Sequence, residues 1–174
     1  MARKAGTGAA VMTRREFFGI VVETVLAALP AERQDVAHRQ TMNLLKMHWG
    51  ANYRVHYEAM IDSERGWLEV GLHFEDGPAS TERLLRYFDT YVLEIKHRLG
   101  VEVELERWTQ SWGHCYELLP LEPLSAELAR TVATRLLAFM NLLQPLLDDA
   151  YELGLVPREP HASTFHQRFR DRRR

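Results

Sequence analysis

Residues 53–75 read YRVHYEAMIDSERGWLEVGLHFE, and this stretch decides the fold. Apolar and polar residues alternate on both sides of residues 63–66, which is the pattern of two half-buried strands joined by a four-residue hairpin loop. With that loop, apolar residues of the two strands meet on one face, and a one-residue slip would destroy the sorting. The predicted pairs are Ile61 with Leu68, Ala59 with Val70, Tyr57 with Leu72, and Val55 with Phe74.

The same register brings His56 opposite His73 on the other face of the hairpin. Imidazoles at directly opposed positions have Cβ atoms about 5 Å apart, which is close enough to share a metal ion. One hypothesis is therefore a divalent-metal site of the two-histidine, one-carboxylate type, which suits iron or zinc, with Glu58 or Glu104 as the carboxylate. The alternative is a solvated polar face without a cofactor, because antiparallel sheets commonly wet one side.

A second hairpin is predicted from the alternation of valine and leucine with glutamate in residues 101–107 and a partner strand at 112–119. We expect a four-residue loop between them, which places Arg107 opposite Trp112. This register turns the side chain of His114 toward the core face, because side-chain direction alternates along a strand.

Tyr116 shares that face with His114 in the predicted register, whereas Cys115 points the other way. Ligand sites are usually apolar cavities with a few convergent polar groups. One hypothesis is an aromatic ligand pocket between sheet and helices, and the alternative is ordinary core packing, which aromatic residues dominate. The predicted pocket residues are Trp112, His114, Tyr116 and Tyr57.

Four helices are predicted from capping signals and from apolar residues at helical spacing. Thr13 begins a capping box, and Ser125 caps a long final helix that Pro145 is expected to kink or restart. The other two predicted helices cover 32–47 and 79–99. The predicted fold class is α+β: a two-layer sandwich in which a four-stranded, mainly antiparallel sheet of two hairpins carries long helices packed on one face.

The chain has 174 residues, of which 46% are apolar, and this size and balance are typical of one globular domain. We predict a flexible leader at 1–12, a single domain at 13–156 and a basic flexible tail at 157–174. No apolar run reaches the roughly 18 residues of a membrane span, so we expect no membrane association. Cys115 is the only cysteine, which excludes a disulfide or a thiolate zinc cluster within one chain, and we expect a cytoplasmic protein.

The net charge of −2 is unevenly spread, because residues 1–15 and 158–174 each carry +4 and the body between them is acidic. An acidic body argues against DNA binding by the folded domain, since phosphate contacts need lysine and arginine. The tail mixes arginine with phenylalanine and histidine. It is predicted either to bind nucleic acid, to lie on the acidic sheet face of its own chain or of a second subunit, or to stay solvated. Its arginines are Arg168, Arg170, Arg172, Arg173 and Arg174.

Four segments carry a resemblance to a known family: LEVGLHFE at 68–75, EIKHRLG at 94–100, VELERW at 103–108 and FMNLLQPLLDDA at 139–150. Their order resembles an uncharacterised bacterial domain that is often appended to restriction-endonuclease-like modules. The resemblance implies a non-catalytic accessory module in a nucleic-acid setting, and it supplies no catalytic residues. The chain departs from that setting because it has no nuclease domain and its body is acidic.

Strong structural signals beside weak chemical ones predict a small, non-catalytic cytoplasmic binding module. We expect it to self-associate as a homo-oligomer and to bind a protein partner or a small ligand. A metal-dependent enzyme using the histidine and glutamate cluster is one alternative. A nucleic-acid accessory protein acting through the arginine-rich tail is the other.

Overall fold

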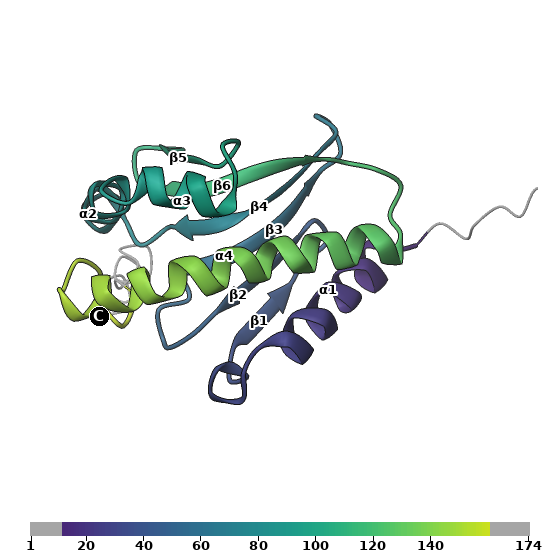
Figure 1. The fold of residues 1–174 in the computed structure, drawn as a ribbon, viewed down its shortest axis with the longest axis horizontal. Helices are drawn as coiled ribbons and strands as arrows, with labels where there is room; N and C mark the ends of the chain where they lie inside the picture. Colours follow the sequence, from purple (N-terminus) through teal and green to yellow (C-terminus); the bar gives the residue numbers. More distant parts are fainter. Residues whose placement is uncertain (1–11, 161–174) are drawn as a thin grey trace, which may run out of the picture.

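The computed structural model describes residues 12–160, which form an α+β fold around one antiparallel sheet (Figure 1). The sheet has six strands in the order β1-β2-β3-β4-β6-β5, whereas the sequence predicted four. The strands are β1 (Ala37–Gln40), β2 (Leu44–His48), β3 (Val55–Asp62), β4 (Trp67–Phe74), β5 (Glu104–Arg107) and β6 (Gly113–Pro120). The helices are α1 (Arg14–Ala28), α2 (Pro78–Asp89), α3 (Val92–Leu99) and α4 (Ala126–Glu152), with a 3-10 turn at Ala31–Arg33.

The hairpin of β3 and β4 forms the centre of the sheet, and its predicted register is confirmed. Ile61 pairs with Leu68 and Val55 with Phe74, and His56 pairs with His73. Gly66 closes the loop with φ +74°, a left-handed conformation that glycine adopts without a steric cost. The apolar residues of both strands are buried on one face, which we call the inner face.

The predicted helix at 32–47 is wrong, because most of this segment forms the hairpin of β1 and β2. Leu45 and Met47 are fully buried on the inner face, and Lys46 between them points to the opposite face. This alternation is the period of a strand. The edge strand β1 is largely exposed, so its own residues carry little apolar pattern.

The predicted register of the second hairpin is wrong by one residue, since Arg107 pairs with Gly113 rather than with Trp112. The loop has five residues instead of four: the Trp108 N–H donates to the Trp112 carbonyl, and Thr109 Oγ1 accepts from the Trp112 N–H at 3.0 Å. The slip moves alternate side chains to opposite faces. Cys115 therefore joins the core.

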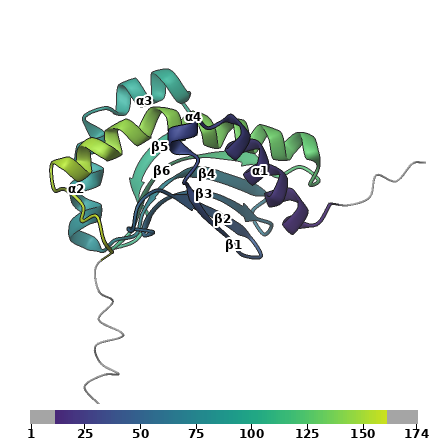
Figure 2. The same ribbon diagram turned by 90° about the horizontal axis from the view of Figure 1, so that it is seen from below.

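Helices α1 and α4 lie over the inner face of the sheet, and the opposite face, which we call the outer face, carries no described helix (Figure 2).

The capping box of Thr13 and Glu16 at the start of α1 is confirmed. Helix α4 runs through Pro145 without a break. The predicted helix at 79–99 is two helices, separated where the Thr90 hydroxyl donates to the Tyr87 carbonyl. Within 12–160, none of the helices combines the length and the apolar character that crossing a membrane requires.

Candidate metal site on the outer sheet face

Three histidines lie side by side in one row across the outer face. The pairing of β3 with β4 sets His56 opposite His73, and the pairing of β4 with β6 sets His73 opposite His114. We call these three residues the histidine row. Strand pairing alone positions them, because each is in register with its neighbour on an adjacent strand.

The histidine row is buried although no described helix covers it: His73 is 1% exposed. Tyr116 stacks on His114 with ring centroids 3.8 Å apart, and Trp108 from the β5–β6 loop stacks on the same imidazole at 5.7 Å. Trp108 also meets the ring of His73 edge-on at 6.1 Å. These aromatic side chains exclude solvent from the imidazoles.

Glu69 connects two of the histidines. Its Oε1 lies 3.0 Å from His73 Nε2 and 3.0 Å from His114 Nδ1, and each of the three residues has a ligand atom within 4.8 Å of those of the other two. Two ligand atoms about 2.1 Å from a metal ion are separated by about 3.0 Å at a right angle and about 3.4 Å at a tetrahedral angle. The spacing of this group therefore fits one bound ion after a small inward movement of the imidazoles.

His73 has no hydrogen-bond partner on either ring nitrogen among the described residues. Its Nε2 lies 3.0 Å from Glu69 Oε1, a contact that lowers the pKa of Glu69, so Nδ1 is the ring nitrogen that lacks a polar partner among the described residues. Buried polar groups are nearly always satisfied, and leaving one unpaired costs about 1–3 kcal/mol. A metal ion bound by Glu69, His73 and His114 would satisfy one of these nitrogens.

His114 has the surroundings of a metal ligand. Its Nδ1 faces Glu69, and its Nε2 lies 3.7 Å from Glu106 Oε1 on the neighbouring strand. Metal-binding histidines commonly donate their second ring N–H to a carboxylate, which fixes the tautomer and the ring orientation. At 3.7 Å the Glu106 carboxylate is the nearest such group but stands beyond hydrogen-bond distance, and it accepts a hydrogen bond from the Tyr116 hydroxyl at 2.8 Å.

A second group of possible ligands surrounds His56 and contains Glu58, His73 and Glu75. Lys46 already supplies a positive charge there: its ammonium lies 3.3 Å from Glu58 and 3.0 Å from Glu75. Glu69, in contrast, pairs only with His73 and His114 within residues 12–160. The Glu69 group is therefore the stronger candidate for a metal ion.

His56 is held by the carbonyl of Tyr53, which accepts a hydrogen bond from Nδ1 at 3.0 Å. Burial lowers the pKa of His56, and the neighbouring carboxylate of Glu58 opposes this effect. With Nδ1 protonated, a neutral ring leaves a bare Nε2 at 3.2 Å from Glu58 Oε2. This contact is favourable only when His56 is protonated or when a cation lies beside both groups.

The buried carboxylate of Glu58 and the half-buried carboxylate of Glu69 are both ionised at neutral pH. Burial alone would raise the pKa of Glu58, but the His56 contact and the charges of His73 and Lys46 lower it to about 2. Burial likewise raises the pKa of Glu69, and contacts with His114 and His73 outweigh it and bring the pKa to about 2. The outer face therefore presents negative charge in a region of low dielectric constant, where a divalent cation is attracted strongly.

Gly71 occupies the middle of the outer face, between Glu69 and His73 on β4 and opposite Tyr116 on β6. A Cβ at this position would lie 2.4 Å from the Cys115 carbonyl oxygen and 2.7 Å from the Tyr116 Cβ. Only glycine allows the two strands to approach so closely here. The close approach brings the ligands of β4 and β6 together.

The structure separates the other residues that the sequence singled out. Glu104 lies on the outer face but pairs with Lys96 at 3.0 Å, outside both ligand groups. Tyr57 is buried on the inner face, whereas His114 and Tyr116 lie on the outer face, so the predicted aromatic pocket does not form.

Cys115 is buried in the core, and burial raises the pKa of its thiol to about 12, so it is not an activated nucleophile. The tail arginines lie outside the described residues.

Glu69 and His114 are the two ligands that sequence reasoning did not assign to the metal site. Glu69 lies four residues before His73 on the same strand, and residues separated by an even number of positions point to the same face of a sheet. The position of Glu69 on the outer face could therefore be predicted from the first hairpin. His114 required the correct loop length of the second hairpin, and the alternation in 101–107 does not specify it.

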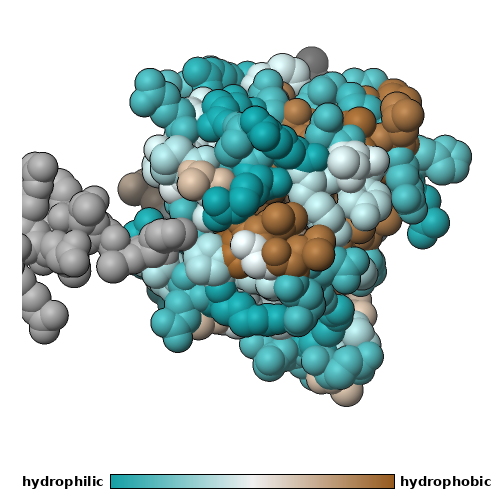
Figure 3. All heavy atoms as spheres, turned by 90° about the vertical axis from the view of Figure 1, so that its left-hand side faces the viewer, coloured by the Kyte–Doolittle hydropathy of each residue, from teal (hydrophilic) through white to brown (hydrophobic). Residues whose placement is uncertain are grey.

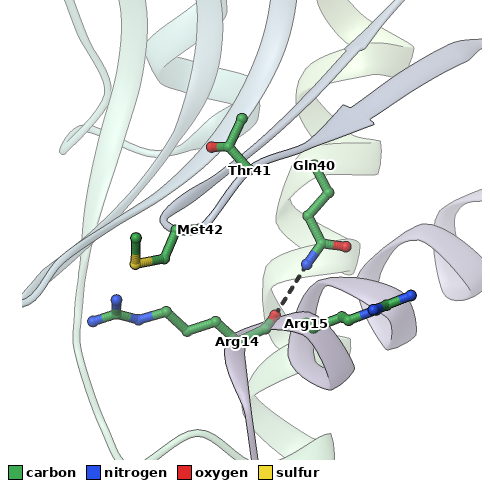
Figure 4. A pocket seen from close by; sticks show the side chains of 5 residues that line it. All are labelled: Arg14, Arg15, Gln40, Thr41 and Met42. Carbon is green, nitrogen blue, oxygen red and sulfur yellow. Dashed lines mark hydrogen bonds between the residues drawn. The ribbon is translucent and has the colours of Figure 1, made fainter.

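A separate open hollow of about 570 Å³ lies between the start of α1 and the turn joining β1 to β2 (Figure 4). The Arg14 and Arg15 side chains extend in different directions in Figure 4, and the Arg14 guanidinium donates to Asn43 and Ser63. Gln40 Nε2 donates to the Arg14 carbonyl at 3.4 Å. No convergent set of ligand groups marks this hollow among the residues that line it.

Comparison of the sequence with protein-family models and with curated proteins gives no match. The resemblance to an accessory domain of restriction-endonuclease-like modules stays a prediction.

Proposed function

We propose that the protein binds one divalent transition-metal ion on the outer sheet face, through Glu69 Oε1, His73 Nε2 and His114 Nδ1. The observation that carries this proposal is the convergence of two buried imidazoles on one ionised carboxylate, with His73 Nε2 and His114 Nδ1 each 3.0 Å from Glu69 Oε1. Two imidazoles and one carboxylate suit zinc, iron, nickel or copper, whereas calcium and magnesium prefer oxygen ligands alone.

Three protein ligands leave further positions on the ion for an exogenous ligand, as in catalytic rather than structural zinc sites. The thiol of Cys115 lies in the core on the other side of the sheet and supplies no fourth ligand. Metal binding is therefore proposed as the function itself, and a reaction at the ion would use these open positions.

The test is a titration of the full chain with zinc, after removal of metal by EDTA, in competition with a chromophoric chelator. We expect one zinc ion per chain. Replacing a ligand, as in His73→Ala, His114→Ala or Glu69→Gln, should weaken zinc binding by more than about 100-fold. Even residues that only hydrogen-bond to metal ligands typically contribute about 10–100-fold to metal affinity. Glu69→Gln keeps the side-chain volume, and circular dichroism shows whether each variant folds.

The matched control is His97→Ala, which removes an exposed histidine of α3 and should leave zinc affinity unchanged. His56→Ala distinguishes the two ligand groups, because it should weaken binding far less than His114→Ala does. Zinc affinity that survives both His73→Ala and His114→Ala would overturn the proposal.

Self-association and a cytoplasmic location stay predictions. Light scattering of the full chain at high micromolar concentration tests the first, and a monomer there would contradict it. Cell fractionation tests the second.

A further inference from the structure

The arginine-rich tail is the strongest sequence feature that metal binding does not explain. Residues 161–174 contain five arginines and one aspartate, and therefore carry a net charge of +4. Phe165 precedes these arginines, and Phe169 lies between Arg168 and Arg170. A segment of this composition needs an acidic surface with aromatic groups as its partner, because guanidinium groups pair with carboxylates and stack on aromatic rings.

The outer sheet face offers such a surface. The edge strand β5 presents Glu104 and Glu106, whose side chains are 56% and 57% exposed, although Glu104 also pairs with Lys96 and Glu106 also accepts from the Tyr116 hydroxyl. Trp108 and Trp112 follow directly in the β5–β6 loop and are 47% and 39% exposed. Among the described strand residues, two basic side chains lie on this face, those of Lys46 and Arg39. Lys46 already pairs with the carboxylates of Glu58 and Glu75.

The described chain ends close to this face. Arg83 Nε donates to the Leu155 carbonyl at 2.6 Å, and Asn52 Nδ2 donates to the Pro157 carbonyl at 2.8 Å. Asn52 precedes β3 by only a few residues, so these bonds fix residues 155–157 beside the end of the sheet where His56 lies. Figure 2 shows the described chain ending at this end of the sheet, and Figure 3 shows that the surface there is mostly hydrophilic.

The tail is long enough to reach the carboxylates. Fourteen residues span at most about 46 Å when extended, at about 3.3 Å per residue. Six strands spaced about 4.8 Å apart make a face about 24 Å across. Residues 161–174 can therefore cross from the end of the described chain to β5.

We propose that residues 161–174 dock on the outer sheet face of their own chain, with the tail arginines against Glu104, Glu106 and the rings of Trp108 and Trp112. A docked tail lies over the side of the sheet that carries the histidine row. The proposal does not depend on metal binding, since it uses the exposed carboxylates and tryptophans rather than the metal ligands.

The experiment places a nitroxide spin label at Gln167→Cys in the full, isotope-labelled chain, with EDTA present throughout. Cys115 is buried, and its raised pKa keeps it unreactive toward the labelling reagent. We expect loss of the backbone amide signals of β5 and of the Trp108 indole signal at low salt. The amide signals of α1, which lies over the other face, should persist. At about 1 M salt, where the Debye length is about 3 Å, the lost signals should return.

The variant Glu104→Gln with Glu106→Gln should also restore the β5 signals, because it removes both exposed carboxylates while an amide oxygen can still accept from Lys96 and from the Tyr116 hydroxyl. The matched control is Glu122→Gln with Glu127→Gln, one change in the loop before α4 and one in its first turn, which should leave the signal loss intact. A β5 signal loss that is absent, or that the Glu104 and Glu106 changes do not alter, would overturn the proposal.

Two further outcomes assign the tail elsewhere and also overturn the proposal. Signal loss in an isotope-labelled chain mixed with a separate spin-labelled chain, at the level seen within one chain, would place the tail on a second copy. Unaffected β5 signals in the chain alone, with the tail signals changing only when a DNA duplex is added, would assign the tail to nucleic acid. Because EDTA is present, neither outcome depends on whether the metal site exists.

Discussion

Leu72 and His73 are consecutive residues of β4, and both are at most 1% exposed, yet they point to opposite faces of the sheet. Leu72 is buried on the inner face, over which α1 and α4 lie. His73 is surrounded by imidazole, indole and carboxylate groups on a face without a described helix. Equal burial therefore has two different physical origins in adjacent residues.

The difference separates stability from chemistry. The inner face removes apolar side chains from water, which contributes about 25 cal/mol for each Å² buried. The outer face buries the ionised carboxylate of Glu58 and three imidazoles, and such groups cost free energy unless they are paired. The side chains of the inner face therefore hold the fold, and those of the outer face carry the proposed metal site.

The largest expected effect is on the inner face. Leu72→Ala should lower the free energy of unfolding by about 2–5 kcal/mol, because it removes a buried side chain and leaves a cavity. Leu118→Ala on the outer face is the control and should cost less than about 1 kcal/mol, since Leu118 is 43% exposed. Urea unfolding of the metal-free chains measures the loss of unfolding free energy in both variants. Equal losses in Leu72→Ala and Leu118→Ala would contradict the distinction between the two faces.

The next effect is the pH dependence of stability, which should come from the outer face. Glu58 and Glu69 have a pKa of about 2 in the folded chain, and a higher one after unfolding. The unfolded state then binds more protons below about pH 5, so stability should fall between about pH 5 and pH 2, by up to about 3 kcal/mol per carboxyl group. The lowered pKa of His56 acts in the same direction, beginning nearer neutral pH.

Urea unfolding at pH 7, 5 and 3.5 measures this effect in the metal-free chain. Glu58→Gln should be less stable than the parent at pH 7, and the gap should narrow as the pH falls. The cost of Leu72→Ala should stay constant over the same range, because that side chain does not titrate. A gap for Glu58→Gln that is independent of pH would contradict the account.

The smallest expected effect concerns the support of the metal ligands. Glu106→Gln should weaken zinc binding by about ten-fold without changing the free energy of unfolding by more than about 0.5 kcal/mol, since Glu106 is exposed and acts through His114. Glu104→Gln is the matched control on the same strand. It should leave zinc affinity unchanged because Glu104 pairs with Lys96 and touches none of the histidines.

The sequence predicted which face of the sheet carries the candidate site, but only some of the residues that form it. The β3–β4 hairpin could be predicted because apolar and polar residues alternate along both strands and the loop is short. Only one register then places all the apolar residues on the same face. That register placed His56 and His73 correctly. The edge strand β1 was missed because its exposed residues carry no apolar period, although Leu45 and Met47 of β2 alternate with polar neighbours.

The third histidine depended on one residue of loop length. Thr109 accepts hydrogen bonds from the Ser111 and Trp112 N–H groups, which extends the β5–β6 loop to five residues. The slip also turns Glu117 toward α4, where Arg135 pairs with it at 2.5 Å and 2.6 Å. That ion pair joins residues 18 positions apart in the sequence, and strand alternation alone cannot reveal it.

The most direct test of the metal site is anomalous diffraction at the zinc absorption edge, from crystals of the full chain grown with one equivalent of zinc. The account predicts one strong peak on the outer face, about 2.1 Å from Glu69 Oε1, His73 Nε2 and His114 Nδ1. A peak elsewhere, such as beside His56 with Lys46 displaced, or no peak near the histidine row would contradict it.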